Sequence, residues 1–415
     1  MRLQKPPERE GAFAGAFRAT ANAFRGGILA VLALLVVGQV IGLVLSLAVR
    51  SIALGTWSRV GLVTSLAAFR AEVAITFSPT TAFGVPLAIG HVASHLVPMA
   101  LTLGFLWLAA HGGRRAARSW PDAPALARTA VAATGAGVSV ALVAALAARF
   151  ATLSFPGSDA TVEVDVASAA VWAGLLAAAA TAIGAYLEGA AGRASAAVLR
   201  GGIAGYLWAL GLLVVGFIAI ATLEPAVTRR YVDGLGAFGS VGPALFGGHV
   251  LALPAQSALL LMPASGACVD LVASGATAVR ICPWSLDPGG PLAGAFVSSH
   301  PVLLSPWFWP LLAIPPLAAF VGGRLAGAGV AAARGAIRGA LAGILFAALG
   351  MLGAAFAAPR VVAPFFAGGL RLEVLPWSLR GAGLVCLWGV LGGAIGGRFA
   401  RRVYEEPELP RPTSA

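Results

Sequence analysis

Residues Gly26–Val49 read GGILAVLALLVVGQVIGLVLSLAV and contain no charged side chain. A helix needs about 20 mostly apolar residues to cross about 30 Å of hydrocarbon, so this stretch is long enough for a transmembrane helix. The whole chain is similar: 59% of its residues are hydrophobic, 11% are charged and the mean hydropathy is +0.89. A soluble domain has about a quarter of its residues charged. We therefore predict an integral membrane protein with a lipid bilayer as its solvent.

Further uncharged stretches of spanning length predict an all-α, polytopic fold with eight spans. The predicted spans are Gly26–Val49, Gly84–Ala110, Thr129–Ala148, Val166–Leu187, Gly201–Leu223, Pro301–Gly323, Gly339–Ala358 and Gly381–Gly397.

The distribution of basic residues predicts the orientation. If the N-terminus is cytoplasmic, the inner segments hold 18 of the 28 basic residues. Because cytoplasmic loops carry an excess of Lys and Arg, we predict that both termini are cytoplasmic. Lys5 is the only lysine, and this bias toward Arg, with abundant Ala and Gly, suggests a bacterial plasma membrane. The net charge of +12 does not indicate nucleic acid, because the arginines are dispersed between apolar stretches. No cleavable signal peptide is predicted, since the first apolar stretch is too long for one.

Two outer segments do not fit plain spans. Val241–Met262 is apolar but contains Pro243, Gly247, Gly248 and Pro254. Broken backbone at membrane depth is tolerated only against protein or a wet cavity. We therefore predict a re-entrant or interfacial hairpin there, with a ninth span as the alternative. Ser51–Phe69 occupies the corresponding place earlier in the chain and is predicted to lie flat on the membrane.

The sequence repeats itself. The stretch RATANAFRGGI at 18–28 recurs as RASAAVLRGGI at 193–203, and Gly112-Gly113-Arg114 recurs as Gly322-Gly323-Arg324. Each copy would contain four spans, an even number, so we predict two parallel repeats related by an axis along the membrane normal. The predicted divisions are a first repeat over 1–192 with an inner amphipathic lead, a second repeat over 193–402 with an outer insertion at about 224–300, and a cytoplasmic tail over 403–415.

Histidines are the first candidate binding residues. His91 and His95 are four residues apart, so on a helix they would share one face. His249 and His300 lie in the second repeat. Imidazole is a common metal ligand, but ordinary hydrogen-bonded interfacial histidines are the alternative. The sequence leaves metal binding open and predicts no cofactor.

Two carboxylates and two cysteines complete the candidate sites. Glu163 and Glu373 are equivalent in the repeat and either form a cation site or pair with Arg149 and Arg360. Their flanks, 161–166 and 370–375, alternate like short strands, so outer β-pairings are expected. Cys268 and Cys282 are predicted to form a disulfide in the outer insertion, with two free thiols as the alternative. In the last span Gly389, Gly393 and Gly397 have the spacing that allows close helix contact.

In layout, the chain resembles uncharacterised multi-pass membrane proteins of actinobacteria, of the streptophobe type. The resemblance lies in the Ala-, Gly- and Arg-rich spans and in the Pro-containing outer segment Leu253–Met262. This resemblance carries over no functional residue.

Three classes of function remain. A permease for a neutral or lipidic solute is favoured by the parallel duplication and the interrupted outer segments, although no Asp, Glu, Lys or Arg lies inside a predicted span. A non-transporting scaffold that assists envelope assembly or cell division, through a membrane or envelope protein partner, fits equally well. An enzyme is not expected, because the chain has no soluble domain and none of the common catalytic motifs. In each case we expect function on the outer side, between the Val241–Met262 hairpin and the span that begins near His91.

Overall fold

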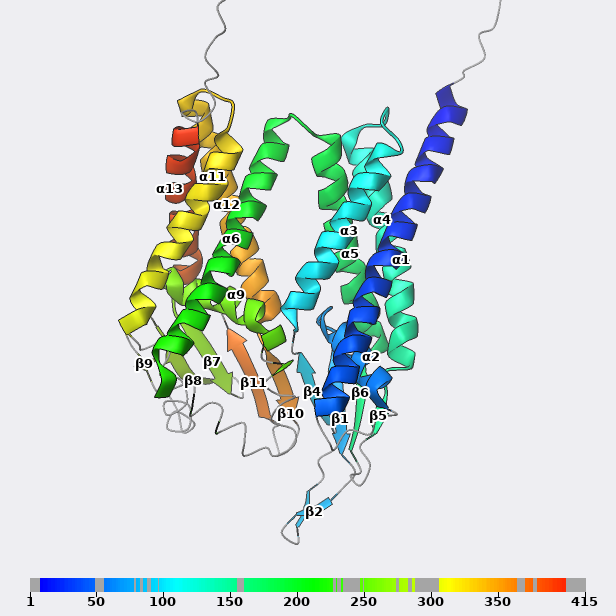
Figure 1. The fold of residues 1–415 in the computed structure, drawn as a ribbon, viewed down its shortest axis with the longest axis vertical. Helices are drawn as coiled ribbons and strands as arrows, with labels where there is room; N and C mark the ends of the chain where they lie inside the picture. The colour runs from blue at the N-terminus through cyan, green and yellow to red at the C-terminus, as the bar shows by residue number, and fades with distance from the viewer. Residues whose placement is uncertain are drawn as a thin grey trace, which may run out of the picture.

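The computed structural model of the protein describes residues 8–48, 56–77, 80–82, 85–87, 91–95, 97–154, 160–226, 229, 233, 247–248, 250–273, 276–282, 286–287, 306–363, 370–375 and 379–400. Helices dominate one part of the molecule and strands the other (Figure 1).

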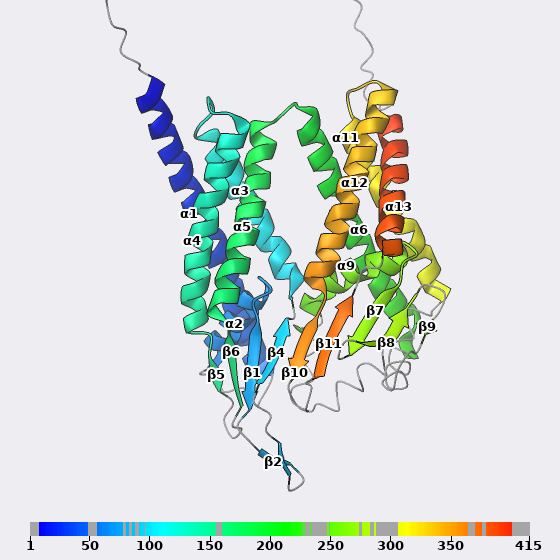
Figure 2. The ribbon, with the colours of Figure 1, turned by 180° about the vertical axis from the view of Figure 1, so that it is seen from behind.

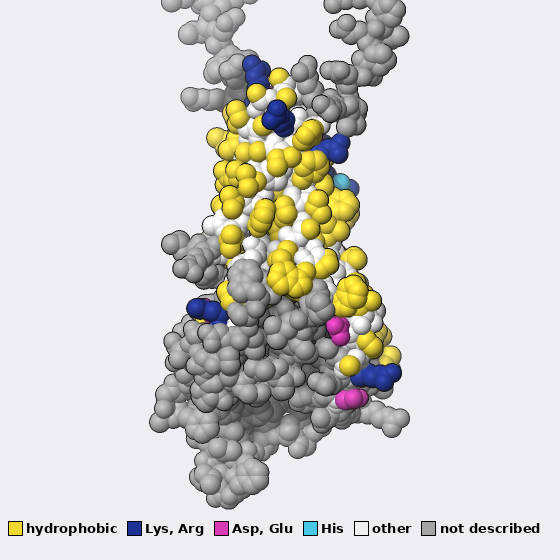
Figure 3. All heavy atoms as spheres, turned by 90° about the vertical axis from the view of Figure 1, so that its left-hand side faces the viewer, with side chains coloured by type: hydrophobic (Ala, Val, Ile, Leu, Met, Phe, Trp, Pro, Cys, Tyr) yellow, Lys and Arg dark blue, Asp and Glu magenta, His cyan; other side chains and the backbone are white. Residues whose placement is uncertain are grey.

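Seven helices in the described part of the chain are long and apolar enough to cross a membrane. They are α1 (Glu8–Ala48), α4 (Ala125–Arg149), α5 (Val166–Gly189), α6 (Ala194–Leu223), α11 (Ile314–Gly327) with the preceding 3₁₀ helix η4 (Pro306–Ala313), α12 (Ala332–Ala357) and α13 (Leu379–Phe399). On the face drawn in Figure 3, hydrophobic side chains cover the helices, and charged side chains gather toward the two ends. The protein is a multi-pass helical membrane protein.

The predicted span Gly84–Ala110 is wrong in its first half. Strands β3 (Val85–Leu87) and β4 (His91–His95) occupy part of it, and helix α3 runs from Met99 to Arg118. Pro98 precedes the first residue of α3. Because proline lacks a backbone N–H and clashes with a preceding helical turn, it is suited to a helix start and not to the middle of a span.

The described parts of the two outer segments each contain a short helix. The described part of Val241–Met262 includes most of α9 (Leu253–Ala264), a 12-residue helix whose buried residues include Ala258, Leu261 and Met262. Within Ser51–Phe69 the chain forms α2 (Trp57–Ala67), which packs on α1 through Gly38 and Gly61. In both segments the described short helix packs against longer helices.

The helices pack as two bundles. In the first bundle, defined here as α1–α5, the core contains Leu66, Phe69, Phe105 and Val140. In the second bundle, defined as α6, α9 and α11–α13 with η4, the core contains Tyr206, Leu213, Leu261 and Phe346. The inner amphipathic lead is the first part of α1, whose Ala23 is buried against the first bundle while Phe13 and Phe17 are exposed.

Glycines allow very close helix contact in the second bundle. A Cβ on Gly389 or Gly393 would collide with the backbone of Gly343 or Gly339 on α12, and one on Gly397 with that of Gly335. The prediction of close contact at these three positions of α13 is confirmed.

Nine strands form one antiparallel sheet in the order β5-β6-β1-β4-β10-β11-β7-β8-β9. Their bounds are β1 (Val73–Phe77), β4 (His91–His95), β5 (Leu153–Ser154), β6 (Ala160–Val164), β7 (Val269–Ala273), β8 (Ala276–Ile281), β9 (Leu286–Asp287), β10 (Arg360–Ala363) and β11 (Leu370–Leu375), and a separate hairpin pairs β2 (Thr80–Ala82) with β3. The first four strands belong to the first half of the chain and the other five to the second. One strand pair, β4 with β10, joins the halves.

The first half of the sheet has an apolar and a polar side. Val73 and Val164 are directly opposite each other and contact the core of the first bundle, whereas Glu163, between two valines on β6, is exposed. This alternation is expected for a sheet that covers a core with one face. Figure 2 shows β1, β4, β10 and β11 from the side on which no helix lies in front of them.

Helix α1 begins and α13 ends at the same end of the molecule, opposite the sheet (Figure 1). The described helix ends there carry many arginines: Arg18, Arg25, Arg114, Arg115, Arg118, Arg128, Arg193, Arg200, Arg324, Arg334, Arg338 and Arg398.

Candidate functional site

The structure places His91 and His95 on strand β4, so the expectation that they share a helix face is wrong. Residues four positions apart are separated by about 13 Å along a strand, whereas along a helix they are separated by only about one turn. The two histidines therefore cannot act as a close pair. The stretch HVASH lies between Pro86 and Pro98, and two prolines twelve residues apart leave little room for a helix between them.

The remaining predicted site residues fall in different places. Glu163 is exposed on β6, opposite Ala74 of β1. Glu373 lies on β11, opposite Arg360 of β10. His249 and His300 lie outside the described residues. Within the described residues, no group of three or more His, Cys, Asp or Glu side chains has an arrangement that could hold a metal ion.

A different set of polar residues gathers where the two halves meet. We call this place the seam and define it by Arg70, Glu72, His95 and Arg360. His95 of β4 is directly opposite Arg360 of β10, and Arg360 is in turn opposite Glu373. The cross-strand row His95–Arg360–Glu373 therefore brings two of the predicted site residues to the same part of the sheet.

The imidazole of His95 contacts two residues just before β1. Its Nδ1 atom lies 3.3 Å from the backbone oxygen of Arg70, and its Nε2 atom lies 3.7 Å from a carboxylate oxygen of Glu72. Burial lowers the pKa of His95, and the nearby Arg70 and Arg360 act in the same direction. The hydrogen bond to Arg70 and the charge of Glu72 oppose this shift, but the pKa is lowered overall. His95 is therefore neutral at pH 7.

Helix α5 fixes the position of Glu72. The backbone N–H of Glu72 donates to the Ser168 hydroxyl at 3.0 Å, and its backbone oxygen accepts from the Asp165 N–H at 3.0 Å. Asp165 caps α5 by accepting from the Ser168 N–H at 2.5 Å. A carboxylate at this position satisfies a helix N–H group that has no partner within the helix. These hydrogen bonds hold the residue before β1 against the start of α5.

Arg70 has an unusual backbone. Its φ of 62° makes it the only non-glycine residue with positive φ in the described part of the chain. For an L-residue the left-handed conformation costs roughly 1–2 kcal/mol. The comparable turn in the second half, between α9 and β7, has Gly266 at φ 87°. A side chain kept at a position that suits glycine indicates that the side chain has a role.

The Arg70 guanidinium bridges the two bundles. Its Cζ atom lies 5.5 Å from the centre of the Trp172 ring on α5 and 5.9 Å from that of the Phe356 ring on α12. The two rings contact each other edge-to-face, with centroids 6.3 Å apart. Cation–π contacts of this length stabilise by about 0.5–2 kcal/mol. They also fix the direction of the guanidinium.

Arg360 contributes a second guanidinium to the seam. Its Nε atom is buried, and no hydrogen-bond partner for it is present in the structure. A buried donor without a partner is costly, especially in a charged group, and it requires an explanation such as a bound ion or water.

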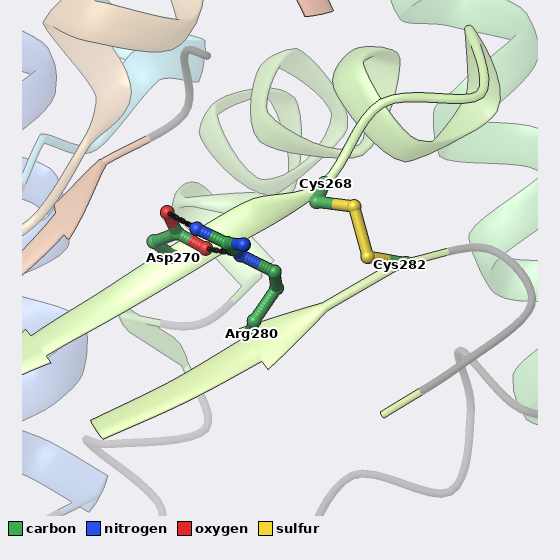
Figure 4. Close-up of a disulfide and its surroundings, with 4 residues drawn as sticks. All are labelled: Cys268, Asp270, Arg280 and Cys282. Carbon is green, nitrogen blue, oxygen red and sulfur yellow. Dashed lines mark hydrogen bonds and ion pairs between the residues drawn. A yellow bond between two sulfur atoms is a disulfide. The ribbon is translucent and has the colours of Figure 1, made fainter. Parts of the chain in front are cut away.

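Cys268 and Cys282 are joined in a disulfide, as expected, with Cα atoms 4.3 Å apart (Figure 4). Next to it, Arg280 makes two hydrogen bonds to Asp270, at 2.7 and 3.0 Å. Both pairs connect β7 and β8 or their ends. Strands β7 and β8 are therefore held together by a covalent bond and by an ion pair in addition to their backbone hydrogen bonds.

Comparison with known proteins found no match. No family model, no curated protein and no solved structure matches this chain. The fold and the seam define the class only: a multi-pass helical membrane protein whose two helix bundles share one β-sheet.

Proposed function

We propose that the protein is a non-transporting, non-catalytic membrane scaffold whose working surface is the polar side of the sheet. The observation that carries this proposal is the difference between the helix interiors and the sheet. In the described helices, the buried side chains that carry a polar atom are hydroxyls of Ser, Thr and Tyr, such as Thr102, Thr181 and Tyr206. The described charged side chains lie instead at the seam, at exposed strand positions such as Glu163, and at the helix ends opposite the sheet.

The hydroxyls inside the first bundle are used for packing. Thr102 donates to the Ala68 carbonyl at 2.6 Å, and Thr181 donates to the Ala109 carbonyl at 3.3 Å. Machines that move ions or protons bury ionisable groups along their pathway. The glycine contacts between α12 and α13 also bring backbones too close for a solute to pass between them. These features support a scaffold over a permease, which we rank second.

We propose that the sheet is extracytoplasmic and that both termini face the cytoplasm of a bacterium. Support comes from the arginines at the helix ends opposite the sheet, as the positive-inside rule requires, and from the Cys268–Cys282 disulfide on the sheet side. Disulfides persist outside the reducing cytosol. A partner of the scaffold would then be a membrane or envelope protein.

We further propose eight spans, with α3 as the eighth, in two parallel copies of one unit over 1–192 and 193–402. The helix contacts support this, because α1–α3, α1–α4, α3–α5 and α4–α5 correspond in order to α6–α11, α6–α12, α11–α13 and α12–α13. Gly26 contacts Gly112 in the first bundle, and the equivalent Gly201 contacts Gly322 in the second. The strand orders β5-β6-β1-β4 and β10-β11-β7-β8 also correspond.

Cysteine accessibility tests whether the interiors of the two helix bundles are closed to water. In a Cys386→Ser background, single cysteines would replace Ala144 and Ala347, which are fully buried in the two bundles, and the exposed Glu163 on the sheet. We expect a small, charged thiol reagent to modify position 163 and neither bundle position. Modification at 144 or 347 in a folded, inserted protein would reveal a water path and contradict the scaffold proposal.

Photo-crosslinking tests the working surface. A photoreactive amino acid would replace Glu163 in one variant and Leu142, which is 61% exposed on the apolar helix surface, in another. We expect a discrete protein adduct from position 163 in cells and lipid adducts from position 142. The absence of a protein adduct from several positions on the polar side of the sheet would contradict a scaffold role for it.

A further inference from the structure

The two halves of the sheet are joined through unlike edges. The first half has the strand order β5-β6-β1-β4, and the second half has β10-β11-β7-β8 with β9 at its end. In these orders β10 corresponds to β5, and β8 corresponds to β4. Because β4 pairs with β10, the last strand of one order lies beside the first strand of the other. A two-fold axis would bring equivalent edges together, so the halves are instead arranged head to tail.

A head-to-tail arrangement leaves two unlike faces at the ends of the molecule. We call them the α11 face, defined by Trp307 and Trp309, and the α4 face, defined by Leu146. Helix α4 with β5 and helix α11 with β9 lie on opposite sides of the molecule (Figure 1). Unlike faces that fit each other can also join one copy of a chain to the next.

The α11 face corresponds to the part of the first half that contacts the second bundle. Val97 and Met99, at the start of α3, are buried in the core of the second bundle. At an offset of 210 residues (307 − 97) they correspond to Trp307 and Trp309, which are 50% and 54% exposed. The same offset brings buried positions into register, since Leu101, Ala109, Gly112 and Gly113 match Leu311, Ala319, Gly322 and Gly323.

The α4 face corresponds to the part of α12 that contacts the first bundle. Phe356 of α12 makes an edge-to-face contact with Trp172 of the first bundle. At the same offset of 210 residues its counterpart is Leu146 (356 − 210), which is 63% exposed. Both sides of the contact between the bundles therefore have an exposed apolar counterpart at an end of the molecule.

Strand β9 occupies the place of a further unit. It pairs with β8 on the edge that corresponds to the edge of β4 on which β10 lies. In a second copy docked in the same way, β5 would take this place. Pro288 directly follows β9, and proline has no N–H to continue a strand ladder.

From these observations we propose that β9 is a cap that keeps the α11 face of one copy of this chain from docking head to tail on the α4 face of another. Repeat proteins commonly need such an element at the end of the array. The proposal rests on the correspondence of the two halves proposed above and not on the scaffold role.

Disulfide trapping between copies of the full chain in membranes tests the cap. In a Cys386→Ser background, Trp309→Cys is combined with Leu146→Cys, so that each copy carries both faces. Because the two positions lie on opposite sides of one molecule, a bond between them joins two copies. Trp309→Cys with Val215→Cys is the matched control, since Val215 on α6 is also 63% exposed.

The cap is removed in two ways. Leu286→Pro with Asp287→Pro takes away the backbone N–H groups of β9, and Leu286→Gly with Asp287→Gly weakens the strand while keeping them. The glycine variant is expected to fold even if the proline variant does not, and thermal unfolding of each variant shows whether it is folded.

With β9 intact we expect the oxidised protein to run as a monomer. In a folded cap variant the 309–146 pair should give dimers and larger species, severalfold more than the 309–215 control. Equal cross-linking with and without the cap, no increase in the folded glycine variant, or the same increase in the control would each overturn the proposal. Photo-adducts from position 163 report on the scaffold role separately, so a failure here leaves that result unchanged.

Discussion

His95 on β4 and Arg360 on β10 lie directly opposite each other, and through this pair of strands the two halves of the chain share one sheet. The same strands also place Ala93 opposite Val362. The seam is therefore both a polar cluster and a mechanical joint between the bundles.

The joint can be tested with an engineered disulfide. Opposed residues on antiparallel strands have Cα atoms about 4.5–5.5 Å apart, which is within the range of a disulfide. We expect Ala93→Cys with Val362→Cys to cross-link spontaneously on the sheet side. If a protease site is inserted in the turn at Gly192, cleaved halves should stay joined on a non-reducing gel. Ala93→Cys with Leu375→Cys, which are not opposed, is the control, and cross-linking only in that control would contradict the strand order.

The orientation can be tested by labelling from outside intact cells. Glu163→Cys lies on the exposed side of the sheet, and Arg115→Cys lies at the opposite end of the molecule. We expect an impermeant maleimide to label position 163 in intact cells and position 115 only after lysis. The reverse pattern would show that the sheet faces the cytoplasm.

Glycine packing in the second bundle should be intolerant of side chains. In Gly393→Val the new side chain would meet the backbone of Gly339, and overpacking of this kind destabilises by about 1–3 kcal/mol. Gly211→Ala on α6 has open space around the new methyl group and should keep the wild-type Tm in detergent. Equal Tm values for both variants would mean that α12 and α13 are not in close contact.

Loss of the disulfide should weaken the second half of the sheet. The bridge joins residues 14 apart, and closing such a loop stabilises by about 3 kcal/mol in the chain-entropy model. We expect Cys268→Ser to lower the Tm, and reducing agent to lower the Tm of the wild-type protein but not of this variant. Cys386→Ser, which removes a free thiol, serves as the control and should respond to reducing agent like the wild type.

His95 should make stability depend on pH. Its pKa is lowered in the folded protein, chiefly by burial, so below about pH 6.5 the unfolded state binds the proton more readily. Stability is therefore complete above the ordinary histidine pKa and decreases as the pH falls toward the folded value. Thermal unfolding at several pH values should show this decrease in the wild-type protein and a smaller one in His95→Gln. An identical pH dependence in both proteins would exclude His95 as its source.

The sequence predicts the membrane class, the long helices, the disulfide and the glycine contacts, because each depends on local composition or spacing. Strands over residues 160–164 and 370–375 also agree with the alternation in the sequence. The nine-stranded sheet could not be predicted, since it pairs short strands from distant parts of the chain. The stretch before Pro98 is uncharged and apolar, and these properties do not distinguish a strand from part of a span.

The candidate site was predicted only in part. The sequence singled out His95 and Glu373, and named Arg360 as a possible partner of Glu373. Arg70, Glu72, Trp172 and Phe356 have no local motif. They come together only through the β4–β10 pairing and the ends of two helices. A left-handed φ at an arginine leaves no signal in a single sequence.

The outermost strands of the sheet, β5 and β9, have only two residues each. A short edge strand offers few free backbone groups to a strand from another molecule. In a membrane crowded with identical copies, long open edges would act as templates that join neighbours into fibrils. With two described residues each, β5 and β9 offer a neighbouring copy few backbone groups for strand pairing, although the sheet between them is wide.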